Sequence, residues 1–289
     1  MASELNQRLR GLFAARKAAI VPGAFNALSA RIVADLGYPA IYVTGAGVTN
    51  GSLGVPDLGL ITLTEIASHV SAMREVVDLP LIVDADTGFG NAVNTYRTIR
   101  VLEHAGANAV QLEDQQFPKR CGHFTGKDVV PAEEMIAKIK AAADARRTDM
   151  MIIARTDARA TMGYEEAIDR ANRYVEAGAD AIFIEAPTSV EEIREMAKLV
   201  EAPHMVNMVI GGITPIMDRA TLEEFGISVV LYANVALQSA ILGMQKALTL
   251  LNEQGAVPEE AGITATFKER QRLVGKPEFD LLEKRYALP

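Results

Sequence analysis

Cysteine is almost absent from this chain of 289 residues, because Cys121 is the only one. A single cysteine excludes a disulfide within the chain and fits a reducing compartment, so we expect a cytoplasmic protein. The sequence also lacks an apolar run of the roughly 20 residues that cross a bilayer. Residues 1–17 mix charges and have no long apolar stretch, so we expect no signal peptide and no membrane association.

An excess of basic side chains is missing as well. The 37 acidic residues outnumber the 29 lysines and arginines, which gives a net charge of −8. This charge argues against a nucleic-acid partner and against an anionic membrane surface. It does not argue against a small anionic substrate, because a local group of cations can oppose the overall charge.

No Gly-x-Gly-x-x-Gly motif follows the first expected strand, which disfavours an open doubly wound sheet. The chain instead repeats one unit, in which an amphipathic segment ends at a glycine and a short apolar run follows. The glycine would close a helix in the left-handed conformation, and the apolar run predicts a buried parallel strand. The unit appears at residues 36–45, 105–114, 177–186 and 225–234.

Four more apolar runs bring the expected strands to eight. They are residues 19–25, 80–87, 151–157 and 204–208. Eight alternating β/α units in about 250 residues predict a (β/α)8 barrel of the TIM type, with an open doubly wound sheet as the alternative. We expect the barrel to span residues 1–245 and a C-terminal helical extension to span 246–289, whose charged tail would pack on a neighbouring subunit.

Polar side chains stand where most of these strands end. Those with candidate roles are Tyr42, Thr44, Asp84, Asp86, Gln111, Glu113, Arg155, Asp157, Glu185 and Asn207. A barrel of this type carries its chemistry at the C-terminal ends of its strands. We therefore expect the active site to be built from this set.

Three of the carboxylates in this set stand at the ends of the third and fourth expected strands. Asp84 and Asp86 are two residues apart and so point to one side of their strand, while Glu113 ends the next strand. Three carboxylates at one barrel mouth repel one another unless a cation lies among them, and an all-oxygen set suits Mg²⁺ or Mn²⁺. The alternative is that they cap helices or pair with Arg155 and Arg159.

Two other strand ends predict anion binding. The small residues 44–47 would expose backbone N–H groups that can hold a carboxylate, although a plain tight turn is the alternative. Arg155 follows an apolar strand, where its guanidinium would bind a carboxylate or enolate oxygen bidentately. An ion pair with Glu185 or Asp157 is compatible with that role.

Cys121 lies in the longest connection between expected strands, from residue 114 to residue 151. Lys119, Arg120 and His123 favour its thiolate form, and Gly122 lets the backbone bend. A long βα loop on the catalytic face often acts as a lid. We therefore expect Cys121 to ride on a movable loop above the carboxylates, with an inert surface thiol as the alternative.

Together these residues resemble the isocitrate lyase/phosphoenolpyruvate mutase superfamily. The matching segments, in order between about residues 5 and 250, are 42–47, 84–90, 113–115, 119–123, 154–157, 185–186 and Asn207. The Lys-Arg-Cys-Gly-His sequence at 119–123 is similar to the lyase branch. The resemblance implies a metal-dependent carbon–carbon lyase for a small dicarboxylate, built as a helix-swapped barrel and assembled as a homotetramer.

The resemblance also implies a ligand set for the metal. Mg²⁺, or Mn²⁺ in its place, would be held by Asp84 and Asp86. Asp57 and Glu113 would reach it through water.

Further roles are implied for the substrate site. Arg155 would hold the pyruvyl part of the substrate, and Cys121 would protonate the departing enolate. Tyr42 is a candidate for the general base. The residues implied in substrate binding are Thr44, Gly45, Ala46, Lys119, Gly122, His123, Glu185 and Asn207.

Departures within the branch narrow the expected substrate. Methylisocitrate lyases usually carry arginine where this chain has Phe124, and a polar pair where it has Met208 and Val209. Phe124, Met208, Val209 and Ile210 are apolar and suit small alkyl groups. We therefore expect a 2-alkylmalate lyase that cleaves 2,3-dimethylmalate to pyruvate and propionate by retro-Claisen/aldol chemistry. Methylisocitrate cleavage, oxaloacetate hydrolysis and, outside catalysis, simple 2-oxo-acid binding are the alternatives.

Overall fold

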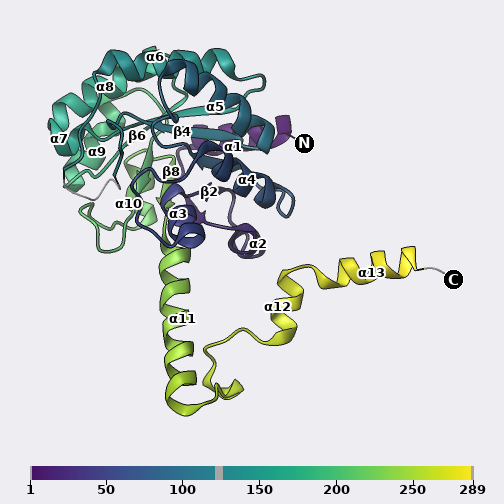
Figure 1. Ribbon diagram of the computed structural model, residues 1–289. Coiled ribbons are helices and arrows are strands. Elements are labelled where there is room, and N and C mark those ends of the chain that lie inside the picture. Colours follow the sequence, from purple (N-terminus) through teal and green to yellow (C-terminus); the bar gives the residue numbers. More distant parts are fainter. Residues whose placement is uncertain (1, 121–125, 288–289) are drawn as a thin grey trace.

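The computed structural model describes residues 2–120 and 126–287 and shows strands alternating with helices (Figure 1). The strands are β1 (Ala19–Ala24), β2 (Ile41–Val43), β3 (Leu81–Asp84), β4 (Ala109–Glu113), β5 (Met151–Thr156), β6 (Ala181–Ile184), β7 (Met205–Asn207) and β8 (Val229–Tyr232). Each overlaps one of the eight apolar runs predicted from the sequence. The strand predictions are therefore confirmed, with ends that differ by a few residues.

All eight strands are parallel and follow the order β6-β5-β4-β3-β2-β1-β8-β7. The two outer strands of that order also meet. The amide of Ile182 in β6 donates to the carbonyl of Pro203 at 2.9 Å, beside a parallel bridge between Ile182 and His204. The sheet therefore closes on itself as a (β/α)8 barrel, and the doubly wound alternative is wrong.

Helices cover the outside of the barrel and continue beyond it (Figure 1). They are α1 (Ala2–Ala15), α2 (Ala27–Asp35), α3 (Gly45–Leu53), α4 (Leu63–Arg74), α5 (Ala92–Ala105), α6 (Ala132–Ala145), α7 (Ala158–Thr161), α8 (Tyr164–Glu176), α9 (Val190–Leu199), α10 (Arg219–Glu224), α11 (Val235–Gln254), the 3₁₀ helix η1 (Glu259–Ala261), α12 (Phe267–Leu273) and α13 (Lys276–Tyr286).

The glycine of each repeated unit performs the role that the sequence predicts. Gly37, Gly106, Gly178 and Gly226 all have positive φ, between 79° and 112°. Residues with a side chain rarely adopt this conformation, whereas glycine does so without steric cost. Each glycine therefore ends its helix and turns the chain into the following strand.

Side chains alternate along the strands between two buried clusters. Ile182 and Ile184 of β6 point outward to the helices, whereas Phe183 points into the barrel. Leu9 and Phe13 of α1 belong to the inner cluster and are fully buried. The barrel interior is thus packed, and α1 contributes to that packing.

Beyond β8 the chain leaves the barrel along α11, which projects well clear of the other elements (Figure 1). The expected boundary between residues 245 and 246 lies inside α11, so the barrel and the helical extension are joined by a continuous helix. Only Leu237 of α11 is buried. Within the described residues, none of the helices is long and apolar enough to cross a membrane.

Candidate active site

The predicted site residues meet at one end of the barrel, around a cavity of about 50 Å³. Those that line it are Tyr42, Thr44, Ala46, Asp57, Asp84, Glu113, Lys119, Arg155, Glu185 and Asn207. Strand register explains part of this meeting, because Gln111 pairs with Asp84 and Arg155 pairs with Glu113 on the adjacent strands. Cys121, Gly122, His123 and Phe124 lie outside the described residues.

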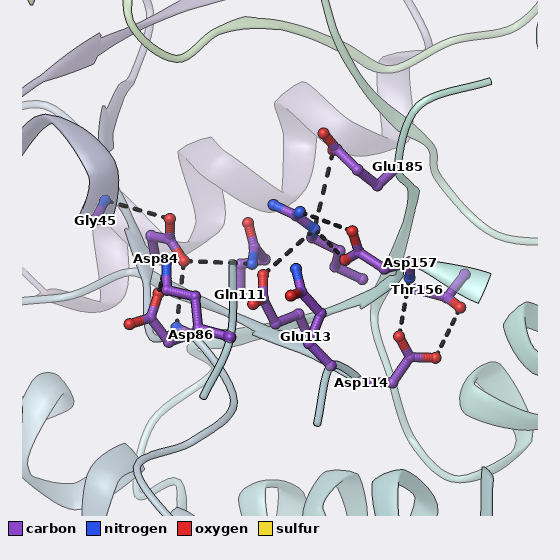
Figure 2. A network of polar contacts seen from close by, with 12 residues as sticks. Gly45, Asp84, Asp86, Gln111, Glu113, Asp114, Thr156, Asp157 and Glu185 are labelled. Carbon is purple, nitrogen blue, oxygen red and sulfur yellow. Dashed lines mark hydrogen bonds and ion pairs between the residues drawn. The ribbon is translucent and has the colours of Figure 1, made fainter. Parts of the chain in front are cut away.

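Asp84 is fixed by two backbone amides. Its Oδ2 accepts from the amide of Gly45 at 3.2 Å, and its Oδ1 accepts from the amide of Asp86 at 3.2 Å (Figure 2). A Cβ on Gly45 would lie 3.0 Å from Asp84 Oδ2, so glycine allows this close approach. The turn predicted to hold a substrate carboxylate is the start of α3, with Thr44 as its N-cap, and the Gly45 amide is committed to Asp84.

Lys119 lies among the carboxylates that were expected to hold the metal. Its Nζ is 2.5 Å from Asp57 Oδ1 and 2.7 Å from Asp86 Oδ1, and its side chain is 3% exposed. Although burial disfavours the charged form, the surrounding acids raise the pKa of Lys119 well above its usual range. Burial raises the pKa of Asp86 to about 7, although Lys119 opposes this shift. The partners of Lys119 are therefore acids, where the resemblance implied a substrate carboxylate.

The carboxylate cluster suits a divalent cation by its chemistry. Asp86 Oδ2 and Glu113 Oε1 are buried and accept no hydrogen bond from the described residues. Buried acceptors without donors are stabilised by a cation, and hard oxygen ligands suit Mg²⁺. As the described side chains stand, no three of the Asp, Glu, His or Cys type are grouped to hold a metal ion. Lys119 supplies the positive charge in this arrangement.

Lys119 also lines a second, larger cavity of about 730 Å³. Leu60, Phe89 and Phe117 contribute to its apolar wall. Of the predicted site residues that the structure describes, only Asp86 and Lys119 line this larger space. The smaller cavity is lined by most of the other predicted site residues that the structure describes and is therefore the candidate reaction site.

Arg155 is held by a buried fork of hydrogen bonds. Its Nε and Nη2 donate to the two oxygens of Asp157 at 2.9 and 3.1 Å. Glu113 and Glu185 lie 3.4 and 3.9 Å from the same Nε. Arg155 lines the cavity, and its Nη1 makes no hydrogen bond with the described residues. The expected ion pair with Asp157 therefore coexists with an available N–H group.

Tyr42 acts as a hydrogen-bond donor in this structure. Its hydroxyl donates to Gln111 Oε1 at 2.5 Å, and the Gln111 amide faces Asp84 Oδ1 at 3.4 Å. Burial, and then the charge of Asp84, raise the pKa of Tyr42 well above its usual range. A raised pKa opposes loss of the phenolic proton, so the geometry favours Tyr42 as a donor over Tyr42 as a base.

The cavity also has an apolar side that the sequence identified only in part. Its wall includes Phe183, Val209, Leu231 and Ala233. The alternation of inward and outward residues along β6 and β8 could have identified Phe183 and Leu231. Of the apolar residues expected to contact an alkyl group, Val209 lines this cavity. Met208 is buried in the outer cluster, and Ile210 is 57% exposed.

Of two residues near Arg155, Asp157 was expected only as an ion-pair partner of this arginine, and Lys127 had no predicted role. Asp157 is fully buried, and the Lys127 Nζ lies 2.6 Å from its Oδ1. Burial favours the protonated acid, but Arg155 and Lys127 hold the pKa of Asp157 at about 2. The pairing with Lys127 has no sequence signal, because 30 residues separate the two positions.

Comparison with known proteins places this geometry in context. Residues 9–251 match the family model described as phosphoenolpyruvate phosphomutase. The chain is 42% identical over 281 residues to 2,3-dimethylmalate lyase of Eubacterium barkeri, with 97% of each chain covered. It is 44% identical over 272 residues to 2-methylisocitrate lyase of Aeropyrum pernix, covering 94% of this chain and 88% of that one.

Solved structures show the same similarity. A structure of 2,3-dimethylmalate lyase has a TM-score of 0.91 and 33% identity, covering 98% of this chain and 95% of the other. One of oxaloacetate acetylhydrolase has a TM-score of 0.91 and 29% identity, with 98% and 97% covered. One of phosphonopyruvate hydrolase with oxalate and Mg²⁺ has a TM-score of 0.87 and 31% identity, with 97% and 98% covered.

Proposed function

Because this chain belongs to the phosphoenolpyruvate mutase/isocitrate lyase superfamily, we propose that it is a carbon–carbon lyase acting on 2-alkylmalates. The favoured reaction is cleavage of 2,3-dimethylmalate to pyruvate and propionate. The observation that carries this choice is the cavity, where Arg155 faces an apolar wall containing Val209 and Leu231. Such a wall accommodates methyl groups better than the additional carboxylate of a tricarboxylate.

The metal would be held by Asp84 and Asp86, with Asp57 and Glu113 around it. This ligand set is supported by the buried acceptors of Asp86 and Glu113 that lack a donor. When bound, Mg²⁺ would supply positive charge next to the oxygen that becomes the 2-oxo group. Lys119 would leave Asp86 when the cation binds, because both positive charges require the same carboxylate.

The chain's own groups would then orient the substrate and move its protons. Arg155 would bind the carboxylate next to C2 through its remaining N–H group, and Tyr42 would donate a hydrogen bond to the reacting oxygen. Glu113, whose buried Oε1 accepts no hydrogen bond from the described residues, would take the 2-hydroxyl proton. The electron pair of the O–H bond would then form the C=O group of pyruvate while the C2–C3 bond breaks, and the C2–C3 pair would pass to the enolate of propionate. Cys121 would give its proton to C3 of that enolate and so complete propionate.

Two alternative substrates follow from the similar relatives. One relative cleaves 2-methylisocitrate by name, and one structural neighbour is an oxaloacetate acetylhydrolase. Methylisocitrate carries one more carboxylate, which would require a cation beside Val209. Oxaloacetate lacks the alkyl groups that the apolar wall would contact. Binding of a 2-oxo acid without catalysis is disfavoured, because the acids and Arg155 are all in place.

A substrate panel tests the proposal. Wild-type protein with Mg²⁺ is assayed for pyruvate release from 2,3-dimethylmalate and methylisocitrate, and for oxalate release from oxaloacetate. We expect kcat/KM for dimethylmalate to exceed the others by about 10-fold or more. A preference for methylisocitrate, or oxalate as the main product, would reject the 2-alkylmalate assignment.

We also propose a cytoplasmic homotetramer in which the C-terminal helices pack on a neighbouring subunit. Support for the packing comes from α11, whose large apolar side chains Ile241, Leu242, Met244 and Leu248 are exposed. Apolar side chains gathered on a projecting helix are stabilised by burial against another chain. The single cysteine supports the reducing compartment. Light scattering of the full chain tests the assembly, and a monomer would reject it.

A further inference from the structure

Asp157 lies between two buried cations that come from different parts of the chain. Arg155 donates to both of its oxygens, at 2.9 and 3.1 Å. Lys127, in the connection between β4 and α6, donates to Oδ1 at 2.6 Å and has a side chain that is 3% exposed. One carboxylate thus links a residue of the reaction cavity to the segment that approaches α6.

A second buried acid, Asp114, holds the backbone that carries this carboxylate. The amide of Asp157 donates to Asp114 Oδ1 at 2.9 Å, and Thr156 Oγ1 donates to Asp114 Oδ2 at 2.7 Å (Figure 2). Tyr174 and Arg170 of α8 also donate to Asp114, at 2.8 and 3.1 Å. A fully hydrogen-bonded buried network of this kind fixes the position of its members.

Without Asp157, the Arg155 guanidinium could form an ion pair with another nearby acid. Glu113 and Glu185 lie 3.4 and 3.9 Å from its Nε, and neither makes the fork that Asp157 makes. Pairing with Glu113 would turn the guanidinium and would occupy an acid of the carboxylate cluster. The fork to Asp157 uses Nε and Nη2, so Nη1 has no hydrogen bond to the described residues.

We propose that Asp157 is a positioning residue that aligns Arg155 for the substrate carboxylate and ties it to Lys127. This inference rests on the proposed function, because it concerns the arginine of that same cavity. Asp157 would not touch the substrate. It would set the affinity for the 2-oxo-acid part of the substrate through Arg155, and the order of residues 126–130 through Lys127.

A merely structural role is the competing explanation, since any acid between two buried cations stabilises a fold. Asp180 offers a matched control at the opposite end of the barrel. It accepts from Arg10 at 3.0 Å, from Arg146 at 2.5 Å and from the amide of Ile152 at 2.8 Å. Asp180→Asn therefore removes an acid between two cations without touching Arg155.

The experiment compares Asp157→Asn, Lys127→Met and Asp180→Asn with the wild type, all as full chains with Mg²⁺. Calorimetry measures the affinity for pyruvate, and steady-state kinetics with the best substrate give KM and kcat. Hydrogen exchange measures the order of residues 126–130. We expect Asp157→Asn to weaken pyruvate binding about 10-fold or more and to raise KM in parallel. We expect Lys127→Met to speed hydrogen exchange over residues 126–130. We expect Asp180→Asn to change neither the affinity for pyruvate nor this exchange.

Unchanged pyruvate affinity in Asp157→Asn would overturn the alignment of Arg155, as would an equal loss in Asp180→Asn. Unchanged hydrogen exchange over residues 126–130 in both Asp157→Asn and Lys127→Met would overturn the proposal that Asp157 orders this segment through Lys127. If the wild type binds no pyruvate and cleaves no member of the panel, the proposed function fails. The exchange measurement still decides the tie to Lys127 in that case, so the two failures are distinguishable.

Discussion

Lys119 and Asp86 form a buried ion pair of 2.7 Å at the position where a metal ion is expected. Asp86 has a φ of 48°, in the left-handed region that residues with side chains seldom adopt. Such strain persists where surrounding contacts fix the residue, and it is frequent at functional sites. The pair therefore joins a strained acid of the cluster to the loop segment that leads to Cys121.

This pair predicts that Lys119 and a divalent cation compete for the same acids. Lys119→Met should raise the affinity for Mn²⁺, because the cation no longer has to displace an ammonium group. Without metal, the variant should lose roughly 3 kcal/mol of stability at pH 8, because buried acids lose their partner. Electron paramagnetic resonance of Mn²⁺ and thermal unfolding with and without Mg²⁺ measure the two effects.

The control for Lys119→Met is Lys17→Met, which removes an exposed ion pair with Glu223. It should leave Mn²⁺ affinity and metal-free stability close to those of the wild type. Equal Mn²⁺ affinity in Lys119→Met and the wild type would contradict the competition.

The barrel could be predicted from local sequence, because each unit carries its own signals. Gly106 and Gly178 mark helix ends through their freedom at positive φ, and the apolar runs after them mark strands. Closure of the barrel also explains why Asp84, Glu113 and Arg155 meet, since parallel strands end on one side. These features depend on short-range chemistry that the sequence displays directly.

The partners of individual side chains could not be predicted in the same way. Lys119 and Lys127 lie on one connection and pair with different acids, Lys119 with Asp57 and Asp86 and Lys127 with Asp157. Tertiary packing, rather than residue type, decides such cases.

Cys121 provides a second prediction, which follows from its role as the proton donor. Cys121→Ser should lower kcat for 2,3-dimethylmalate by about 100-fold or more, because serine is a far weaker acid. Pyruvate affinity should stay close to the wild-type value, since the thiol acts on the other fragment. A stopped assay for pyruvate and a binding titration separate the two effects. A variant that turns over at the native rate would reject Cys121 as the donor.

The apolar wall gives a third prediction, about specificity. Val209→Arg places a cation in the cavity, so kcat/KM for 2,3-dimethylmalate should fall about 10-fold or more relative to methylisocitrate. Ile210→Arg is the matched control, because Ile210 is 57% exposed and does not line the cavity. The measurement is the ratio of kcat/KM for the two substrates in each variant. A shift of equal size in both variants would show that the added charge acts from a distance.

His204 yields a fourth prediction, concerning stability in acid. Burial lowers the pKa of His204 to about 4, while the Nε2 lies 3.1 Å from the Val200 carbonyl. The unfolded chain therefore takes up a proton near pH 6.5 while the folded chain does not. Stability is fully present above pH 6.5 and falls as the pH drops toward 4, by about 3 kcal/mol in total.

Replacement of this histidine should flatten that dependence on pH. His204→Gln can still donate to the Val200 carbonyl but cannot gain a charge, so its loss of stability between pH 7.5 and pH 5 should be smaller by about 2 kcal/mol. Urea unfolding at several pH values measures the difference. His104→Gln, at an exposed position on α5, should follow the wild-type curve. Parallel curves for the wild type and His204→Gln would mean that other groups cause the loss of stability in acid.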